Sequence, residues 1–170
     1  MVESKKTLPG TPIAGTEWES ETYSFRKHSA QLKYAWDAGS AVSGFLEGLK
    51  EGRILGRRCN RCMRVLVPPR SFCETCFRST DEWVEVKDTG RVNTYSVSYV
   101  NNDASRRDKP LIVAVIEIDG ASPGMGFLHV LGEVEPSKVH VDMKVKAVWK
   151  PRDERVGAIT DIKYFKPLEA

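Results

Sequence analysis

Four cysteines could do chemistry in this chain, and they form two C-x-x-C pairs, Cys59 with Cys62 and Cys73 with Cys76. A C-x-x-C turn directs two thiolates toward one centre, and two such turns complete a tetrahedral site with four sulfur ligands. Because the protein supplies every ligand, no coordination position stays open for water or substrate. The pattern therefore predicts a structural metal site rather than a hydrolytic one.

Zinc is the metal that this ligand set favours, and iron in a rubredoxin-like site is the second candidate, because geometry and ligand softness separate the two poorly. Two disulfides are the alternative use of four cysteines. The sequence shows no secretory signal, which argues against them, since cytosolic thiols stay reduced. A glycine often follows the second cysteine of such a turn, but Met63 and Phe77 stand there. We expect both turns to close with more strain.

The composition, 170 residues of which 41% are hydrophobic and 29% charged, fits one compact domain with an appendage. Residues 1–15 lack the apolar segment of a signal peptide, and no stretch is long enough to span a bilayer. We therefore expect a cytoplasmic protein.

The positive charge of the chain is concentrated around the cysteines. Residues 50–78 contain eight basic and two acidic residues, a net charge of +6, so the remainder carries −3 of the total +3. Four thiolates on a divalent ion would leave this segment near +4. Such a charge indicates a polyanionic partner: nucleic acid, a phosphorylated cofactor or an acidic protein face. The alternative is a solvated surface that keeps a small metal module soluble.

Ahead of the cysteines, the sequence predicts an extended arm over residues 1–23 and a helical segment over residues 24–52. Helical spacing of apolar residues favours one short helix over residues 24–37 and a second that Ser40 caps and Gly52 ends. Their apolar faces could pack on the chain's own core or on a partner subunit.

Residues 53–79 are predicted to form a zinc ribbon, a small hairpin with a short strand at Val65–Val67 and too little apolar content to fold without its metal. Over residues 80–170 the pattern changes to β, and the continuous apolar run Leu111–Ile118 predicts a fully buried strand. Strands are expected at residues 82–87, 91–100, 111–118, 126–134, 145–150 and 158–165.

A small closed barrel would leave these strands without exposed edges. A five-stranded OB-fold fits the size of the segment best, and a β-sandwich is the alternative. The predicted fold class is mainly β, with N-terminal helices, a rubredoxin-like zinc ribbon and then an OB-fold barrel.

Six short motifs follow one another along the chain, and their order resembles that of one protein family. They are FLEGLKEG, Arg-Cys-x-x-Cys, Pro-Arg-x-x-Cys-x-x-Cys, Gly-Arg-Val-x-Thr-Tyr-Ser, Lys-Pro-Leu and Leu-Gly-Glu-Val. Over residues 41–165 the chain resembles the zinc-ribbon/OB-fold proteins, formerly a domain of unknown function, that accompany thiolases and other acyl-CoA enzymes. The resemblance implies a non-catalytic accessory or scaffold subunit. It would bind acyl-CoA, a thiolase-like or HMG-CoA-synthase-like enzyme, or an aldolase that uses CoA thioesters.

The residues themselves also indicate no active site. Thiolase chemistry needs a nucleophilic cysteine activated by a histidine, and the metal accounts for all four cysteines. The histidines, His28, His129 and His140, form no visible constellation with serine or aspartate. We expect each to be a surface residue or a histidine with satisfied hydrogen bonds.

If CoA binds, its phosphates need cationic donors, and arginine suits them because its planar guanidinium donates two hydrogen bonds at once. The candidates are Arg70 beside the second cysteine pair and three residues of an expected loop between strands, Arg106, Arg107 and Lys109. Lys150 and Arg152 are weaker candidates. For each of them, a solvated surface charge is the alternative.

Single-stranded nucleic-acid binding is the alternative function, because an OB-fold with a basic ribbon can track a backbone while aromatic rings stack on bases. Tyr95 and Tyr99, four residues apart on one expected strand, could form such a platform. The net negative charge outside the ribbon argues against it. A rubredoxin-like electron carrier would need iron, and the large attached barrel argues against that function.

Overall fold

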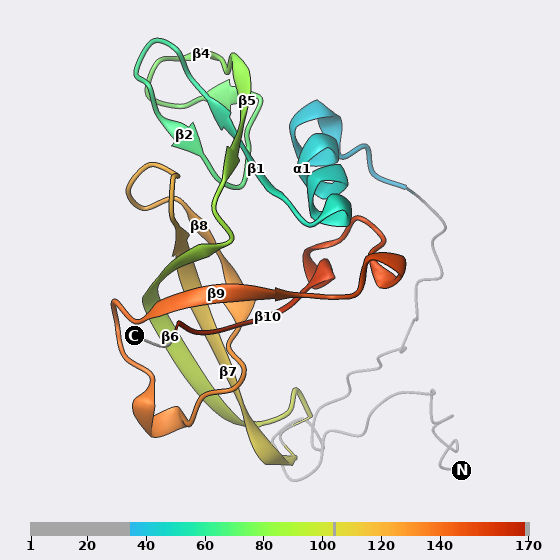
Figure 1. The fold of residues 1–170 in the computed structure, drawn as a ribbon, viewed down its shortest axis with the longest axis vertical. Coiled ribbons are helices and arrows are strands. Elements are labelled where there is room, and N and C mark those ends of the chain that lie inside the picture. The colour runs from blue at the N-terminus through green and yellow to red at the C-terminus, as the bar shows by residue number, and fades with distance from the viewer. Residues whose placement is uncertain (1–34, 104, 169–170) are drawn as a thin grey trace, which may run out of the picture. The chain divides into compact units, whose positions relative to one another are not determined.

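The computed structural model describes residues 35–103 and 105–168. The predicted arm and residues 24–34 of the predicted first helix lie outside this part of the chain, and residues 35–37 are not helical. From Ala38 onward the chain forms one compact unit, which contains a helix, the ribbon and the barrel (Figure 1).

Helix α1 (Gly39–Glu51) begins one residue before its predicted cap. Ala38 occupies the N-cap position and makes no side-chain hydrogen bond, so the predicted capping role of Ser40 is wrong. The helix ends as predicted at Gly52, whose φ of 80° is a left-handed conformation that glycine adopts without steric cost. The local stop signal was therefore more informative than the start signal.

The apolar face of α1 packs on the chain's own core. Phe45 and Leu49 are buried in the same cluster as residues of the ribbon and the barrel. The ring of Phe45 meets that of Phe127 in the barrel edge to face, with the ring centroids 6.2 Å apart. The sequence left two packing partners open for this face, the chain's own core and a partner subunit. In the structure the face packs on the core.

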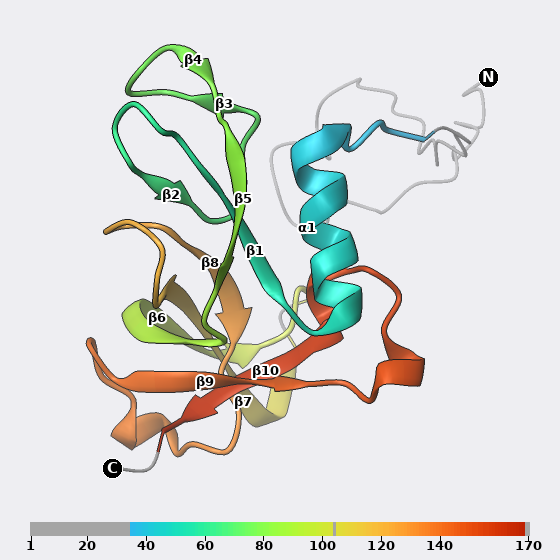
Figure 2. The same ribbon diagram turned by 45° about the horizontal axis from the view of Figure 1, so that its top comes forward.

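The ribbon consists of two small antiparallel sheets (Figure 2). In the first, β1 (Ile54–Arg58) lies between β2 (Val65–Leu66) and β5 (Glu82–Val86). In the second, β3 (Phe72–Cys73) pairs with β4 (Arg78–Ser79). Strand β5 lies at the residues predicted for a strand, but it pairs with β1 rather than with a barrel strand.

The barrel sheet has five antiparallel strands in the order β10-β9-β6-β7-β8. The strands are β6 (Thr89–Val100), β7 (Arg106–Ile118), β8 (Gly126–Val130), β9 (Lys144–Trp149) and β10 (Ile162–Pro167). The 3-10 helices η2 (Pro136–Lys138), η3 (Arg152–Glu154) and η4 (Ile159–Asp161) lie in the connections.

The two edges of this sheet meet where Leu131, directly after β8, forms an isolated parallel bridge with Phe165 of β10. The N–H of Gly132 donates to the carbonyl of Phe165 at 2.8 Å. This contact closes the sheet into a barrel, as an OB-fold requires, and the predicted mainly β architecture with an OB-fold is confirmed.

Strand β7 differs from its prediction as a fully buried strand. Ile112, Ala114 and Ile116 are buried, whereas Val113 and Val115 between them are only half-buried. The prediction is wrong because the alternating side chains of β7 face the core on one side and the outside of the barrel on the other.

A helix that crosses a bilayer must be both long and apolar, and the part of the chain that the structure describes contains no such helix.

Candidate metal centre and ligand-binding residues

The four cysteine sulfurs converge at the tip of the ribbon and all lie within 4.8 Å of one another. The Sγ atoms of Cys62 and Cys73 are 3.6 Å apart, and all four cysteines are free thiols. A tetrahedral zinc ion with Zn–S bonds of about 2.3 Å would hold its sulfurs about 3.8 Å apart. The donor set and its spacing thus fit the predicted four-sulfur metal site and not two disulfides.

Each cysteine pair closes its turn with the same backbone hydrogen bond. The N–H of Met63 donates to the carbonyl of Cys59 at 2.7 Å, and the N–H of Phe77 donates to that of Cys73 at 2.9 Å. Met63 and Phe77 have φ values of 61° and 52°, a left-handed conformation that costs a residue with a Cβ on the order of 1 kcal/mol. The strain predicted from the missing glycines is present at both turns.

The thiols do not share one electrostatic environment. The backbone N–H of Cys62 lowers the pKa of the Cys59 thiol to about 6; burial opposes this shift, and the N–H of Arg61 supports it. Burial, and after it the neighbouring sulfurs of Cys62 and Cys59, raise the pKa of the Cys76 thiol to about 12. Four thiolates therefore need a cation to offset their repulsion, which a divalent metal supplies.

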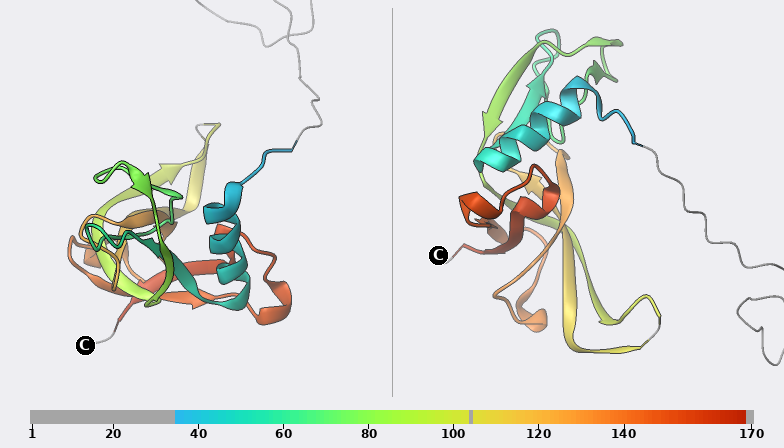
Figure 3. Two further views of the ribbon diagram at one scale, coloured as in Figure 1. Left: turned by 90° about the horizontal axis from the view of Figure 1, so that it is seen from above. Right: turned by 90° about the vertical axis from the view of Figure 1, so that its right-hand side faces the viewer.

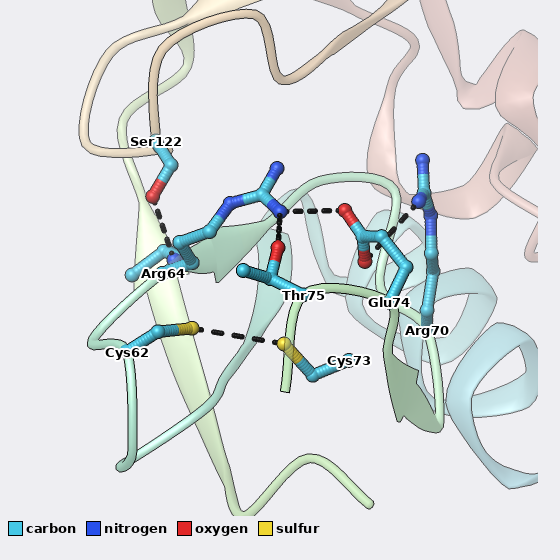
Figure 4. A network of polar contacts seen from close by, with 8 residues as sticks. Cys62, Arg64, Arg70, Cys73, Glu74, Thr75 and Ser122 are labelled. Carbon is cyan, nitrogen blue, oxygen red and sulfur yellow. Dashed lines mark hydrogen bonds and ion pairs between the residues drawn. The ribbon is translucent and has the colours of Figure 1, made fainter. Parts of the chain in front are cut away.

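A buried threonine ties the strands of the ribbon together. Thr80 accepts hydrogen bonds from the Arg57 guanidinium at its carbonyl, 2.7 Å, and at its hydroxyl, 3.0 Å. The same hydroxyl donates to the carbonyl of Arg70 at 2.8 Å. Beside the cysteines, Arg64 donates to Glu74 at 2.6 Å, and Arg70 pairs with the same carboxylate at 3.5 Å (Figure 4). Through these contacts Arg57, Arg64 and Arg70 stabilise the conformation of the ribbon.

Most of the basic residues at positions 50–78 have partners within the chain. The pairs are Arg53 with Glu51 and Glu85, Arg57 with Thr80 and the face of Trp83, Arg58 with Glu82, Arg64 and Arg70 with Glu74, and Arg78 with Asp81. Three of the carboxylates follow residue 78, so the excess charge of the segment is partly compensated by the next strand. Among the described residues, Lys50 and Arg61 are the two of these eight without such a partner. This pairing weakens the argument for a polyanionic partner.

The candidate phosphate-binding residues lie in two separate places. Arg70 belongs to the ribbon, whereas Arg106, Arg107 and Lys109 lie at the start of β7, at the tip of the β6–β7 hairpin. The hairpin tip and the ribbon are at opposite ends of the unit (Figures 1 and 3). The structure therefore brings three of the four together and leaves Arg70 apart. Lys150 follows β9, and Arg152 begins η3.

The three residues at the hairpin tip are on a strand rather than in the expected loop, because β7 already begins at Arg106. The Arg107 guanidinium donates to the Asn101 side chain at 2.7 Å and to the carbonyl of Lys109 at 3.2 Å. The tip encloses a shallow hollow of about 420 Å³ lined by Asn101, Arg106, Arg107, Asp108 and Lys109. An anion in this hollow would meet three cations and one carboxylate.

Both described histidines have hydrogen-bond partners, as expected. Nδ1 of His129 accepts from the N–H of Val130 at 2.9 Å, and Nε2 lies 3.2 Å from the carbonyl of Ile159, which assigns the proton to Nε2. His140 is exposed, and its Nδ1 lies 2.9 Å from the carbonyl of Val141. His28 lies outside the described residues. The hydrogen-bond partners of both described rings are backbone groups rather than a cysteine or serine.

The sequence reading missed Asp161, a fully buried carboxylate at the end of η4. It accepts backbone N–H groups from Gly157 at 2.7 Å, Ala158 at 3.0 Å and Val156 at 3.1 Å. No sequence signal distinguishes it from a surface aspartate, because its donors come from a loop whose conformation the sequence pattern does not specify. Its role is to fix the loop that contacts α1.

Comparison with known proteins gives two adjoining matches to family models. The model described as "ChsH2, rubredoxin-like zinc ribbon domain" matches residues 46–82, and the one described as "ChsH2, C-terminal OB-fold domain" matches residues 83–150. Together the two matches span more than half of the chain.

Curated relatives include two archaeal proteins named "DUF35 domain-containing scaffold protein". The one from Methanocaldococcus jannaschii is 32% identical over 119 residues, which cover 68% of this chain and 82% of the relative. The one from Methanothermobacter thermautotrophicus is 26% identical over 117 residues, 67% of this chain and 86% of the relative. A "Probable enoyl-CoA hydratase alpha subunit" from Thermomonospora curvata is 27% identical over 109 residues, which cover 64% of this chain but 33% of that protein.

Two solved structures share the fold. A DUF35-family protein of unknown function from Sulfolobus solfataricus is 32% identical, with a TM-score of 0.56 and coverage of 65% of this chain and 78% of that one. A chain of the Ltp2-ChsH2(DUF35) aldolase has the same TM-score of 0.56 at 24% identity, with coverage of 79% and 98%. At that identity the second similarity concerns the fold alone.

Proposed function

The chain belongs to the DUF35 family of ChsH2-type zinc-ribbon and OB-fold proteins, and from this premise we propose that it is a non-catalytic accessory subunit, a scaffold that binds an acyl-CoA enzyme and its CoA thioester. Two relatives that match most of their own length are named scaffold proteins, and a third is named a subunit of a probable enoyl-CoA hydratase. These names support a role beside an acyl-CoA enzyme.

The observation that carries the non-catalytic part of this proposal is the closed geometry of the metal centre. All four cysteines of the chain converge on one four-sulfur site, so no cysteine is left to act as a thiolase-type nucleophile. A metal with four protein ligands has no open position at which to activate water. The chemistry of a complex would then belong to the partner enzyme.

The partner in this proposal is a thiolase-like or HMG-CoA-synthase-like enzyme in the cytoplasm. For the CoA phosphates, the hairpin tip with Arg106, Arg107 and Lys109 is the better supported contact, because its three cations share one hollow. Arg70 already pairs with Glu74 in the ribbon and would contribute only to a separate contact.

The test is to purify the tagged chain from its native host at moderate salt and identify the proteins that accompany it. We expect one acyl-CoA enzyme in stoichiometric amount, and we expect CoA to bind the reconstituted complex in calorimetry. Nuclease-sensitive RNA or DNA without an acyl-CoA enzyme would contradict the proposal and favour a nucleic-acid-binding OB-fold. In that case Tyr95 and Tyr99, both exposed, would be the next residues to substitute.

A further inference from the structure

The two metal-binding turns expose large apolar side chains at the tip of the ribbon. Met63 is 61% exposed and Phe77 is 81% exposed, and each directly follows a cysteine ligand. Phe72 is 48% exposed, and its ring lies edge to face with that of Phe77 at 6.2 Å between centroids. Phe72 and Phe77 thus form one exposed aromatic pair, and Met63 follows the other cysteine turn of the same four-sulfur site, whose sulfurs lie within 4.8 Å of one another.

Folding gives no reason for an exposed apolar side chain at Met63, and for Phe72 and Phe77 it gives only their contact with each other. The left-handed φ at Met63 and Phe77 favours glycine, and exposure to water favours a polar side chain. None of the three side chains belongs to the buried core cluster or packs against it. Met63 and Phe77 occupy equivalent positions of the two turns, and both combine a left-handed φ with exposure of an apolar side chain. This repetition indicates that the side chains serve a contact outside the chain.

One exposed arginine near these side chains has no acidic partner among the described residues. Arg61 lies between the first two cysteines, is exposed and has no ion pair among the described residues. Its neighbours Arg58 and Arg64 each pair with a carboxylate of the chain. One available guanidinium beside an apolar patch suits a protein surface with a single carboxylate, whereas a nucleic-acid backbone is bound through several cations.

We propose that Met63, Phe72, Phe77 and Arg61 form a docking surface, here called the knuckle surface, that binds a partner protein with an apolar recess and a carboxylate at its border. The proposal rests on the proposed function in that the partner is the acyl-CoA enzyme, and it assigns the contact to the ribbon tip rather than to the barrel. Exposed aromatic side chains that enter a recess are the residues that dominate the affinity of such interfaces.

The test compares binding of the purified enzyme that accompanies the wild-type chain to four variants. We expect Phe77→Gly to weaken its affinity at least about tenfold, Met63→Gly to act in the same direction, and Arg61→Gln to make binding less sensitive to salt. Val156→Ser, at a residue 73% exposed outside the ribbon, should leave affinity unchanged. Both glycine variants should keep their zinc and a melting temperature near that of wild type, because relief of the left-handed strain offsets the entropy that glycine adds to the unfolded chain and, at position 77, the lost ring contact with Phe72.

The glycine variants separate loss of contact from loss of fold. An affinity of the Met63→Gly/Phe77→Gly double variant within about twofold of wild type would overturn the knuckle surface while leaving the accessory function intact. Anionic vesicles of phosphatidylserine and phosphatidylcholine that bind wild type but not Phe77→Gly would overturn it too, by assigning the surface to a membrane.

If no acyl-CoA enzyme accompanies the chain, the proposed function fails and the knuckle surface is tested separately. A photoreactive benzoylphenylalanine then replaces Phe77, with the same substitution at Val156 as control. Cross-linking from position 77 alone to one protein, whose purified form binds Phe77→Gly at least about tenfold more weakly, would support the surface. Cross-links to nucleic acid, or equal cross-linking from both positions, would overturn it.

Discussion

The hydroxyl of Ser122 (Figure 4) accepts a hydrogen bond from the backbone N–H of Val65 at 2.9 Å, while the N–H of Ser122 donates to the carbonyl of Val65 at 3.0 Å. Val65 lies in β2 of the ribbon, and Ser122 lies in the turn between β7 and β8 of the barrel. Ser122 thus satisfies both the backbone N–H and the carbonyl of Val65. The strand to which Val65 belongs, β2, pairs with β1. Together with the shared core, this pair fixes the ribbon on the barrel.

Replacing Ser122 by alanine should loosen this connection without breaking it. The variant keeps the backbone donor but leaves the N–H of buried Val65 without its acceptor, at a cost of about 1–2 kcal/mol in the free energy of unfolding. Denaturant unfolding and hydrogen exchange at the Val65 amide measure the effect. Ser71→Ala, at an exposed ribbon serine, is the control, and equal stability of both variants would show that the pair contributes nothing.

Removal of a metal ligand should have a larger effect. Cys59→Ser and Cys73→Ser should each release the metal and unfold at least residues 53–79, because binding of a structural zinc provides on the order of 10 kcal/mol of folding free energy. Zinc content by emission spectroscopy and thermal melting followed by circular dichroism measure both consequences. A chelator acting on the wild-type chain should reproduce them, and a variant that retained its fold and its zinc would refute the structural role of the metal.

Local patterns were enough to predict the metal centre and most of the elements. The spacing of Cys59, Cys62, Cys73 and Cys76 specifies a four-sulfur site almost independently of the fold, because each turn is closed by residues adjacent in sequence. The end of α1 at Gly52 is likewise a local property, and the barrel strands follow from alternation and turn residues.

The features that the sequence did not predict depend on contacts between distant residues. Nothing local to β5 indicates that β1 is its partner, and the pairing of Arg58 with Glu82 is visible only once the two strands are adjacent. The same holds for the early start of β7, since a strand that projects beyond the barrel is stabilised by its neighbour β6 rather than by apolar alternation. Charge counted along the sequence therefore overstated the free positive charge of the ribbon.

The buried carboxylate of Asp161 predicts a specific response to pH. Burial raises its pKa, but hydrogen bonds from the N–H groups of Val156, Ala158 and Gly157 outweigh this effect, and the pKa lies below its ordinary value of 3.8. Ionised Asp161 therefore stabilises the fold above pH 3.8, and this contribution is lost as the pH falls through the lower pKa of the folded state.

Asp161→Asn should accordingly lower the free energy of unfolding by about 2 kcal/mol at neutral pH, because an amide offers one acceptor oxygen in place of two. Urea unfolding from pH 7 to pH 3 should show the difference from wild type shrinking at the acidic end. Asp142→Asn is the control, since Asp142 is exposed and its φ of 66° is one that asparagine tolerates. A difference that stayed constant with pH would show that Asp161 does not act through its charge.

Charge reversal at the hairpin tip tests the proposed CoA contact. Arg106→Glu/Arg107→Glu should weaken CoA binding by about tenfold, and by less as salt increases, because exposed guanidinium–phosphate contacts are screened. Lys87→Glu/Lys163→Glu, at two exposed lysines, changes the net charge equally and should leave affinity nearly unchanged. Calorimetric titration with CoA at low and moderate salt distinguishes a local contact from a general charge effect. An equal loss of CoA affinity in both double variants would show that the hairpin tip acts only through the general electrostatic field of the protein. No loss of affinity in either variant would exclude the tip from the CoA site.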